Sequence, residues 1–132
     1  MRRGLHVLMS LMVFSVLLYA QSSTDDQKNE AKKLFNDGNA LYKSGNYLAA
    51  AEKYKGALAV EEDFSYHYQL GLCYKNSKQY DNAVASLLGS IKIRPNFAGS
   101  HNAIGGVYLI QSDFDNALES FKTALKYDPK LK

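Results

Sequence analysis

Cysteine is nearly absent from this sequence, since Cys73 is the only one among 132 residues. A single thiol can form neither an internal disulfide nor a cysteine-based zinc site. The folded chain must therefore owe its stability to packing. Cys73 could pair with a second molecule, but its place in the pattern described below favours a buried role as a small apolar residue.

Sequence motifs for catalysis are also missing. The chain has no Ser-His-Asp signature, no glycine-rich phosphate-binding loop and no HExxH helix. We therefore predict that the protein is not an enzyme and uses no cofactor.

Positive charge is scarce beyond the first residues. Without Arg2 and Arg3, the 16 basic residues fall to 14 against 13 acidic ones, a net charge of +1. A nearly neutral chain lacks the concentrated positive field that nucleic-acid binding requires. We expect no nucleic-acid partner.

Residues 5–20 contain no Asp, Glu, Lys or Arg, and Arg2 and Arg3 stand ahead of them. A basic start, an apolar run and a small residue, Ala20, are typical of a cleaved export signal. We predict that residues 1–20 are a signal peptide and that the protein is periplasmic or secreted. The alternative is an uncleaved anchor at residues 5–20, because Leu18 is bulkier than the residue usually found three before a cut. A membrane span needs about 20 apolar residues, which favours cleavage.

The next ten residues, 21–30, are polar and are interpreted as a linker or as the beginning of the first helix. Thr24 with Gln27 three residues later is a possible capping box. Asp25 and Asp26 would suit the positive end of a helix dipole.

Three units of nearly equal length follow, at residues 31–63, 64–97 and 98–131. When they are aligned, the eighth and twentieth columns are invariant, and they hold Gly38, Gly71 and Gly105, then Ala50, Ala83 and Ala117. Apart from a few exceptions, apolar or small residues fall at columns 4, 7, 8 and 11 of the units, and again at 20, 21, 24, 27 and 28. This spacing indicates two amphipathic helices a unit. Polar or breaker residues at 43–46, 75–79 and 111–114 indicate a tight turn between the two. The fold class is therefore all-α.

Glycine inside a helix costs about 1 kcal/mol relative to alanine, so a glycine column requires a packing reason. We expect the paired helix to approach closely at this column.

The pattern resembles the tetratricopeptide repeat, a 34-residue helix-turn-helix unit with small residues at columns 8, 20 and 27 and Pro near column 32. Pro95 and Pro129 occupy column 32. The resemblance implies an α-solenoid of three repeats at residues 31–131, stacked as a right-handed superhelix. Glu62, Asp37 and the two histidines at column 4, His67 and His101, depart from the family pattern.

In this family the first helix of each unit lines a concave groove that binds a protein or peptide partner. Carried over column by column, the candidate binding residues are Phe35, Asn36, Asn39, Tyr42, Lys43, Tyr68, Gln69, Leu72, Lys75, Asn76, Asn102 and Leu109. The same columns also hold Lys32, Ser65, Gly99, Ala103, Gly106 and Ile110. An extended peptide or a helix would suit such amides and rings.

One variant of the family grips the C-terminal carboxylate of chaperones with five cationic or amide residues. The matching positions here are Phe35, Asn39, Gln69, Gly99 and Ala103. Only Asn39 fits that variant, so we do not expect an adaptor for cytosolic chaperones. We expect an exported interaction scaffold or an accessory subunit of an envelope complex.

His67 and His101 leave open an alternative from another class, a small metal-binding or enzymatic factor. They occupy the same column of neighbouring units. Helical layers lie about 8–10 Å apart, however, whereas a zinc ligand lies about 2 Å from the ion. No third ligand occurs at a convincing spacing, so we expect no metal site.

The last unit ends with apolar residues that nothing further along the sequence covers. They are Leu118, Phe121 and Leu125, together with Leu109 and Ile110. Repeat stacks usually need a polar terminal face. We expect this face to contact a second copy or a larger partner.

Overall fold

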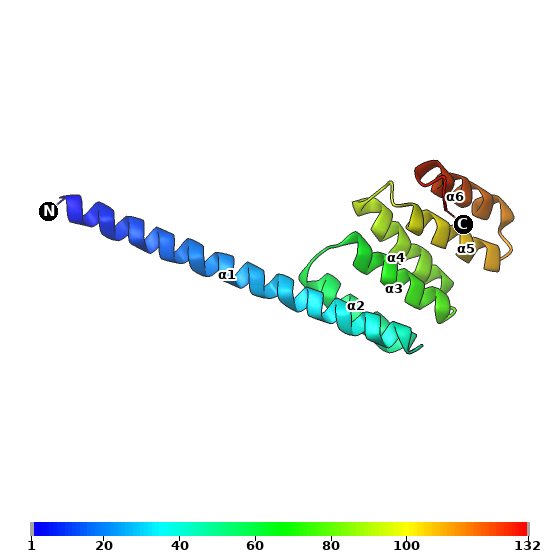
Figure 1. Ribbon diagram of the computed structural model, residues 1–132, viewed down its shortest axis with the longest axis horizontal. Helices are drawn as coiled ribbons and strands as arrows, with labels where there is room; N and C mark the ends of the chain where they lie inside the picture. The colour runs from blue at the N-terminus through cyan, green and yellow to red at the C-terminus, as the bar shows by residue number, and fades with distance from the viewer. Residues whose placement is uncertain (1, 132) are drawn as a thin grey trace.

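The computed structural model describes the backbone of residues 2–131 and the side chains of residues 12–131. The described part is all-helical and contains six helices (Figure 1). They are α1 (Arg2–Lys43), α2 (Tyr47–Val60), α3 (Phe64–Asn76), α4 (Tyr80–Ile93), α5 (Ala98–Ile110) and α6 (Phe114–Tyr127). The predicted all-α class is confirmed.

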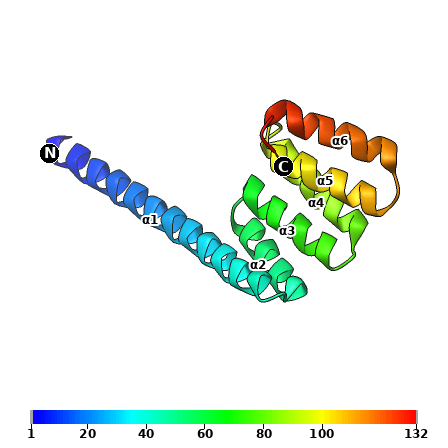
Figure 2. The same ribbon diagram turned by 45° about the vertical axis from the view of Figure 1, so that its right-hand side comes forward.

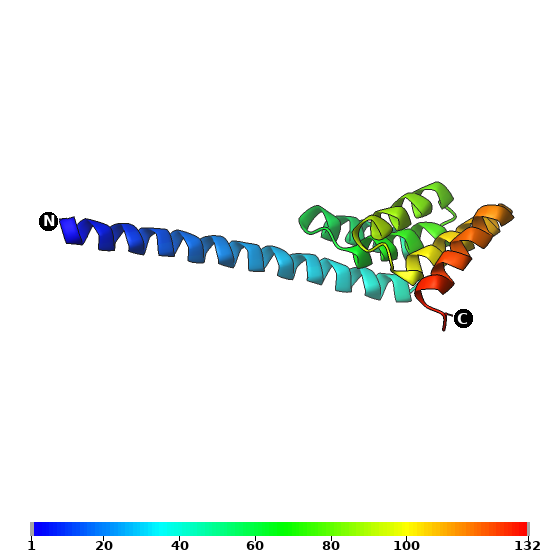
Figure 3. The same cartoon turned by 90° about the horizontal axis from the view of Figure 1, so that it is seen from above.

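The helices form three hairpins, in which α1 pairs with α2, α3 with α4, and α5 with α6. Each hairpin packs on the next through α2 against α3 and α4 against α5, and α3 also contacts α5. The result is a short stack from which the first part of α1 projects as a long straight arm (Figures 2 and 3). This arrangement is the predicted α-solenoid.

The three turns have one conformation. Residue 15 of each unit has a positive φ: Gly45 (80°), Lys78 (61°) and Ser112 (60°). In each turn the next backbone N–H donates to the carbonyl five residues back, as Asn46 N does to Leu41 O at 2.9 Å. These are the bonds of a Schellman helix ending. The predicted turn positions are confirmed.

The glycine column has the packing reason that the sequence requires. A Cβ on Gly71 would lie 2.6 Å from Leu87 Cγ and 3.2 Å from the backbone oxygen of Ala83. The equivalent neighbour is the ring of Tyr54 at Gly38 and the ring of Phe121 at Gly105, both 2.7 Å from such a Cβ. The glycine therefore makes room for the large side chain at column 24 of the paired helix.

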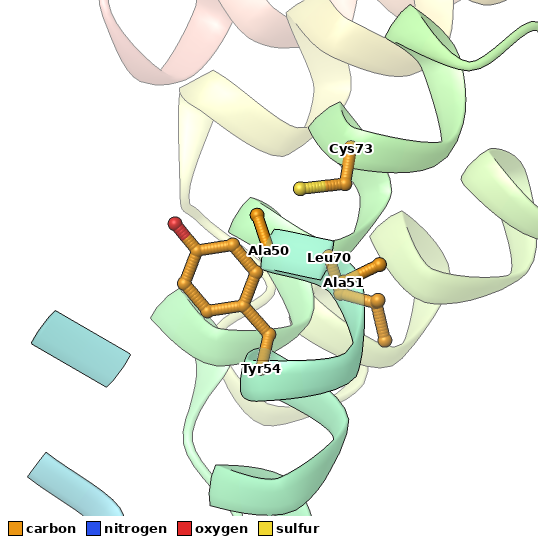
Figure 4. Packing of buried hydrophobic residues seen from close by; sticks show 5 residues of the cluster. All are labelled: Ala50, Ala51, Tyr54, Leu70 and Cys73. Carbon is orange, nitrogen blue, oxygen red and sulfur yellow. The ribbon is translucent and has the colours of Figure 1, made fainter. Parts of the chain in front are cut away.

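The core of the first two units gathers around Tyr54, whose exposed fraction is 0%. Figure 4 shows Tyr54 with Ala50 and Ala51 of α2 and with Leu70 and Cys73 of α3. Cys73 is also 0% exposed, so its predicted burial is confirmed. Burial raises the pKa of the Cys73 thiol to about 12, which makes it a poor nucleophile at neutral pH.

Residues 21–30 are helical and continuous with both sides of α1. Thr24 Oγ1 donates to the carbonyl of Gln21 at 2.8 Å from within the helix. The capping box suggested for Thr24 and Gln27 is therefore wrong, because the helix does not begin there. The helix that contains the apolar residues before position 21 continues without a break through this polar stretch.

The expected signal peptide lies partly outside the described side chains, which begin at residue 12. From Met12 to Tyr19 the large apolar side chains of α1 are exposed, and Phe14 and Leu17 are each 61% exposed. Within residues 2–131, no helix carries an apolar stretch long enough to cross a membrane.

Candidate functional site

An open pocket lies on one face of the stack between α1 and α3. Its volume is about 470 Å³, and it is lined by Asn39, Tyr42, Lys43, Tyr68, Gln69 and Leu72. All six are candidate groove residues of the sequence analysis. They share this face because columns 5, 6, 9, 12 and 13 fall on one side of a helix, and the first helices of neighbouring units lie beside each other.

The rim of the pocket is joined across the two helices. Asn76 Nδ2 donates to Tyr42 Oη at 2.9 Å, which ties the end of α3 to the end of α1. Tyr42 also packs edge-on against Tyr47, with ring centroids 5.2 Å apart. Partial burial raises the pKa of Tyr42 and of Tyr68. Both phenols therefore stay neutral at physiological pH and keep their hydroxyl protons to donate.

Asn39 is positioned by a core residue. Tyr54 Oη donates to Asn39 Oδ1 at 2.7 Å. Because its oxygen is held by Tyr54, Asn39 offers its amide nitrogen to a ligand. Tyr54 lies on α2 in a column that the repeat explains as packing. Its second role could not be predicted from the sequence, because no motif indicates it.

The other candidates divide into three groups. Phe35 belongs to the core, since its ring centroid lies 4.8 Å from that of Tyr66 and 5.6 Å from that of Tyr54. Lys75 is half-buried beside Gly106, with its Nζ 3.9 Å from where a Cβ of that glycine would lie. Asn36, Asn102 and Leu109 do not line the pocket, and Leu109 is 50% exposed at the far end of α5.

An aromatic group that was not predicted from the sequence adjoins the pocket at Tyr68. Phe97 packs edge-on against Tyr68 and Phe64, with centroid distances of 5.1 and 5.0 Å. The Arg94 guanidinium carbon lies 4.7 Å from the centroid of the Phe64 ring. Phe97 is the last residue of its unit, outside the columns that form the helices, so no periodicity marks it. Arg94 thus places a cation beside this aromatic group, and Lys43 lines the neighbouring pocket.

The two histidines have different partners and do not act together. His67 Nε2 lies 2.8 Å from Glu62 Oε2, whereas His101 Nε2 donates to the backbone oxygen of Pro95 at 2.8 Å. His67 and Glu62 line a pocket of about 500 Å³ with Gly89, Lys92 and Ile93. Among the described residues, no three His, Cys, Asp or Glu side chains come close enough to hold a metal ion.

Family models match almost all of the stacked part of the chain. A tetratricopeptide repeat model matches residues 35–98, and a second one matches residues 98–131. Residues 35–131 therefore belong to the tetratricopeptide repeat family. The two matches meet at Ala98, which is also the first residue of the third unit predicted from the sequence.

Similar proteins are larger or share only the fold. BBSome complex member BBS4 of Mus musculus is 28% identical over 92 residues, which make up 69% of this chain and 18% of BBS4. Heat shock protein STI1 of Saccharomyces cerevisiae is 28% identical over 97 residues, 72% of this chain and 16% of STI1. This chain thus spans less than a fifth of either relative.

A solved structure has a similar arrangement of helices. The second tetratricopeptide repeat domain of Spaghetti (RPAP3), bound to the HSP90 peptide SRMEEVD, superposes with a TM-score of 0.75 at 18% identity. The superposition covers 81% of this chain and 99% of that one. At this identity the likeness concerns the fold.

The tetratricopeptide repeat positions that bind a chaperone carboxylate in one variant of the family carry no cation here. Phe35 is in the core, and Ala103 is only 6% exposed. Gly99 lies under Phe97, whose Cζ would be 2.8 Å from a Cβ of that glycine. None of these five residues can therefore supply the cations with which that variant binds a carboxylate. The exposed cation that lines the pocket, Lys43, is at a different column.

Proposed function

We propose that this tetratricopeptide repeat chain is an exported scaffold, which binds an extended or helical segment of a partner protein in the pocket between α1 and α3. The observation that carries the proposal is the lining of that pocket, where six predicted residues from two helices converge. Amide groups at Asn39 and Gln69 can bond the backbone of a peptide, and the rings and Leu72 can hold its side chains. The protein would act by binding, as a free adaptor or as a permanent subunit of an envelope complex.

The geometry supports a rigid site. The Tyr54–Asn39 and Asn76–Tyr42 hydrogen bonds fix one amide and one phenol before any ligand arrives. Preorganised groups lose less conformational entropy on binding.

Peptide selection tests the binding site. A random dodecapeptide library displayed on phage would be selected on the full chain, and the affinities of the selected peptides would be measured by fluorescence anisotropy. We expect Gln69→Arg, which puts a larger charged side chain into the pocket, to weaken binding at least tenfold. Gln111→Arg, the same exchange on an exposed turn outside the pocket, should leave affinity unchanged. Equal binding to the wild type and Gln69→Arg would contradict the proposed site.

The export component has its own test. The intact mass of the chain recovered from cells that make it should lack residues 1–20, and the chain should be found outside the cytoplasm. A full-length chain in the cytoplasm would refute export and leave the peptide site untouched.

A further inference from the structure

Among residues 12–131, no helix covers the face of α6 that corresponds to a covered face of α2 and α4. Phe114, Leu118 and Leu125 are 65%, 54% and 47% exposed. At the same three columns α2 has Tyr47, Ala51 and Leu58, and α4 has Tyr80, Val84 and Ile91, all buried or half-buried. In those two units the first helix of the next unit covers this face. Among the described residues, nothing plays that part for α6.

The opposite end of the stack could not serve as the missing cover. At columns 3, 7 and 10, α3 packs on the preceding unit with Tyr66, Leu70 and Cys73, all buried. In α1 these columns hold Lys33, Asp37 and Ala40, and all three are exposed. Docking α1 of a second copy on α6 would bury a Lys and an Asp against leucines, which is costly. Head-to-tail growth of the stack is therefore disfavoured.

The charges of α6 are arranged so that the helix complements itself. Its exposed acidic residues, Asp115 and Glu119, precede its exposed basic residues, Lys122 and Lys126. Viewed along the helix axis, all four residues lie within about 100° of Leu118. They lie on the same side of the apolar stripe that Leu118 and Leu125 form. In an antiparallel pair of α6 helices, residue numbers that sum to about 242 lie opposite each other. Leu118 then meets Leu125, Glu119 meets Lys122 and Asp115 meets Lys126.

We propose that two copies of this chain associate tail to tail, with their α6 helices antiparallel about a two-fold axis near residue 121. The apolar stripe of each copy covers that of the other, and the opposite charges set the orientation and register of the pair. The pocket between α1 and α3 stays open in both copies, because α6 contributes no residue to it. The pair would therefore present two peptide sites, and it would gain avidity toward a partner with two binding segments.

Charge exchange tests the pairing. The full chain, kept soluble in a mild detergent, would be examined by sedimentation equilibrium at high micromolar concentration. The wild type should be a dimer. The all-basic variant, Asp115→Lys with Glu119→Lys, and the all-acidic variant, Lys122→Glu with Lys126→Glu, should each raise the dimer dissociation constant at least tenfold. An equal mixture of the two should recover a mixed dimer with the wild-type constant.

A second pair of variants separates this face from general stickiness. Leu118→Asp should give a monomer, whereas Leu48→Asp, at a leucine of α2 that is 59% exposed, should stay dimeric. Circular dichroism would check that each variant remains helical. A monomeric wild type would overturn the proposal. So would double variants that pair as tightly as the wild type, or a mixture that stays monomeric, and either result would leave the face to a different partner.

Discussion

The glycine column allows a prediction that sets helix propensity against packing. Replacing Gly71 by Ala should destabilise the protein even though alanine is the better helix former. The added Cβ would lie 2.6 Å from Cγ and 2.9 Å from Cδ2 of Leu87, and 3.2 Å from the backbone oxygen of Ala83. Leu87 is 0% exposed, so it can make room for this carbon only by displacing the residues packed around it.

The expected size follows from two opposing contributions. Alanine in place of glycine gains about 1 kcal/mol of helix stability. Forcing an extra carbon into a close-packed core costs roughly 1–3 kcal/mol. Gly71→Ala should therefore lower the free energy of unfolding by up to roughly 2 kcal/mol.

A matched variant isolates the packing contribution. Gly106 lies inside α5, and its Cβ would meet only Lys75 Nζ, at 3.9 Å. Gly106→Ala should thus be stabilising by about 1 kcal/mol. Urea unfolding followed by circular dichroism at 222 nm measures both, and the difference between the variants should be roughly 1–3 kcal/mol. If Gly71→Ala were as stable as Gly106→Ala, the contact between Gly71 and Leu87 would not be the reason for the glycine.

Three further predictions can be checked by the same unfolding measurement. Ser100 Oγ donates to Ser90 Oγ at 2.8 Å and both are 0% exposed, so Ser90→Ala should cost about 1–3 kcal/mol. The double alanine variant should recover most of that loss, and a purely additive double variant would contradict the pairing. Asp63 caps α3 by accepting from Ser65 N at 2.7 Å, so Asp63→Ala should cost about 1 kcal/mol and Asp63→Asn clearly less. Burial raises the pKa of Cys73 from 9.0 to about 12, so the unfolded chain loses this proton first and stability should fall as pH rises above 9. Cys73→Ala should reduce the loss measured between pH 8 and pH 10, and an unchanged loss would mean that the thiol is not responsible.

Columns that touch a neighbouring helix were predictable from the sequence. The glycine at column 8 and the alanine at column 20 repeat because the two helices of each unit approach closely there. With the apolar columns and the polar residues between the helices, they located the turns and hairpins. The same columns correctly predicted that Cys73 is buried, because column 10 lies on the packed side of the first helix of the unit. It could not show that α1 runs unbroken through residues 21–30, because a polar stretch with possible capping residues is compatible with either a helix or a linker.

Groove residues were predictable only where the column decides the direction of the side chain. Six of the twelve candidates line the pocket, but Phe35 turned inward because Tyr54 and Tyr66 offer it aromatic partners. Phe97 lies beside the pocket although it is the last residue of its unit and belongs to no helical column. A repeat pattern describes what the units share, and these two side chains depend on neighbours that only one unit has.

Tyr54 shows that one residue of so small a stack can belong both to the core and to the groove. Its ring fills the space above Gly38, and the same ring carries the hydroxyl that reaches through to Asn39 in the pocket. Leu87, at the equivalent column of the second unit, fills the space above Gly71 but has no polar atom to extend to the groove. The first unit can therefore fix the orientation of its groove amide through the core, whereas the second unit cannot do so at this column. An asymmetry of this kind, between residues at one column, gives one end of a repetitive surface a fixed hydrogen-bonding group, and the proposed peptide would meet that group at this end.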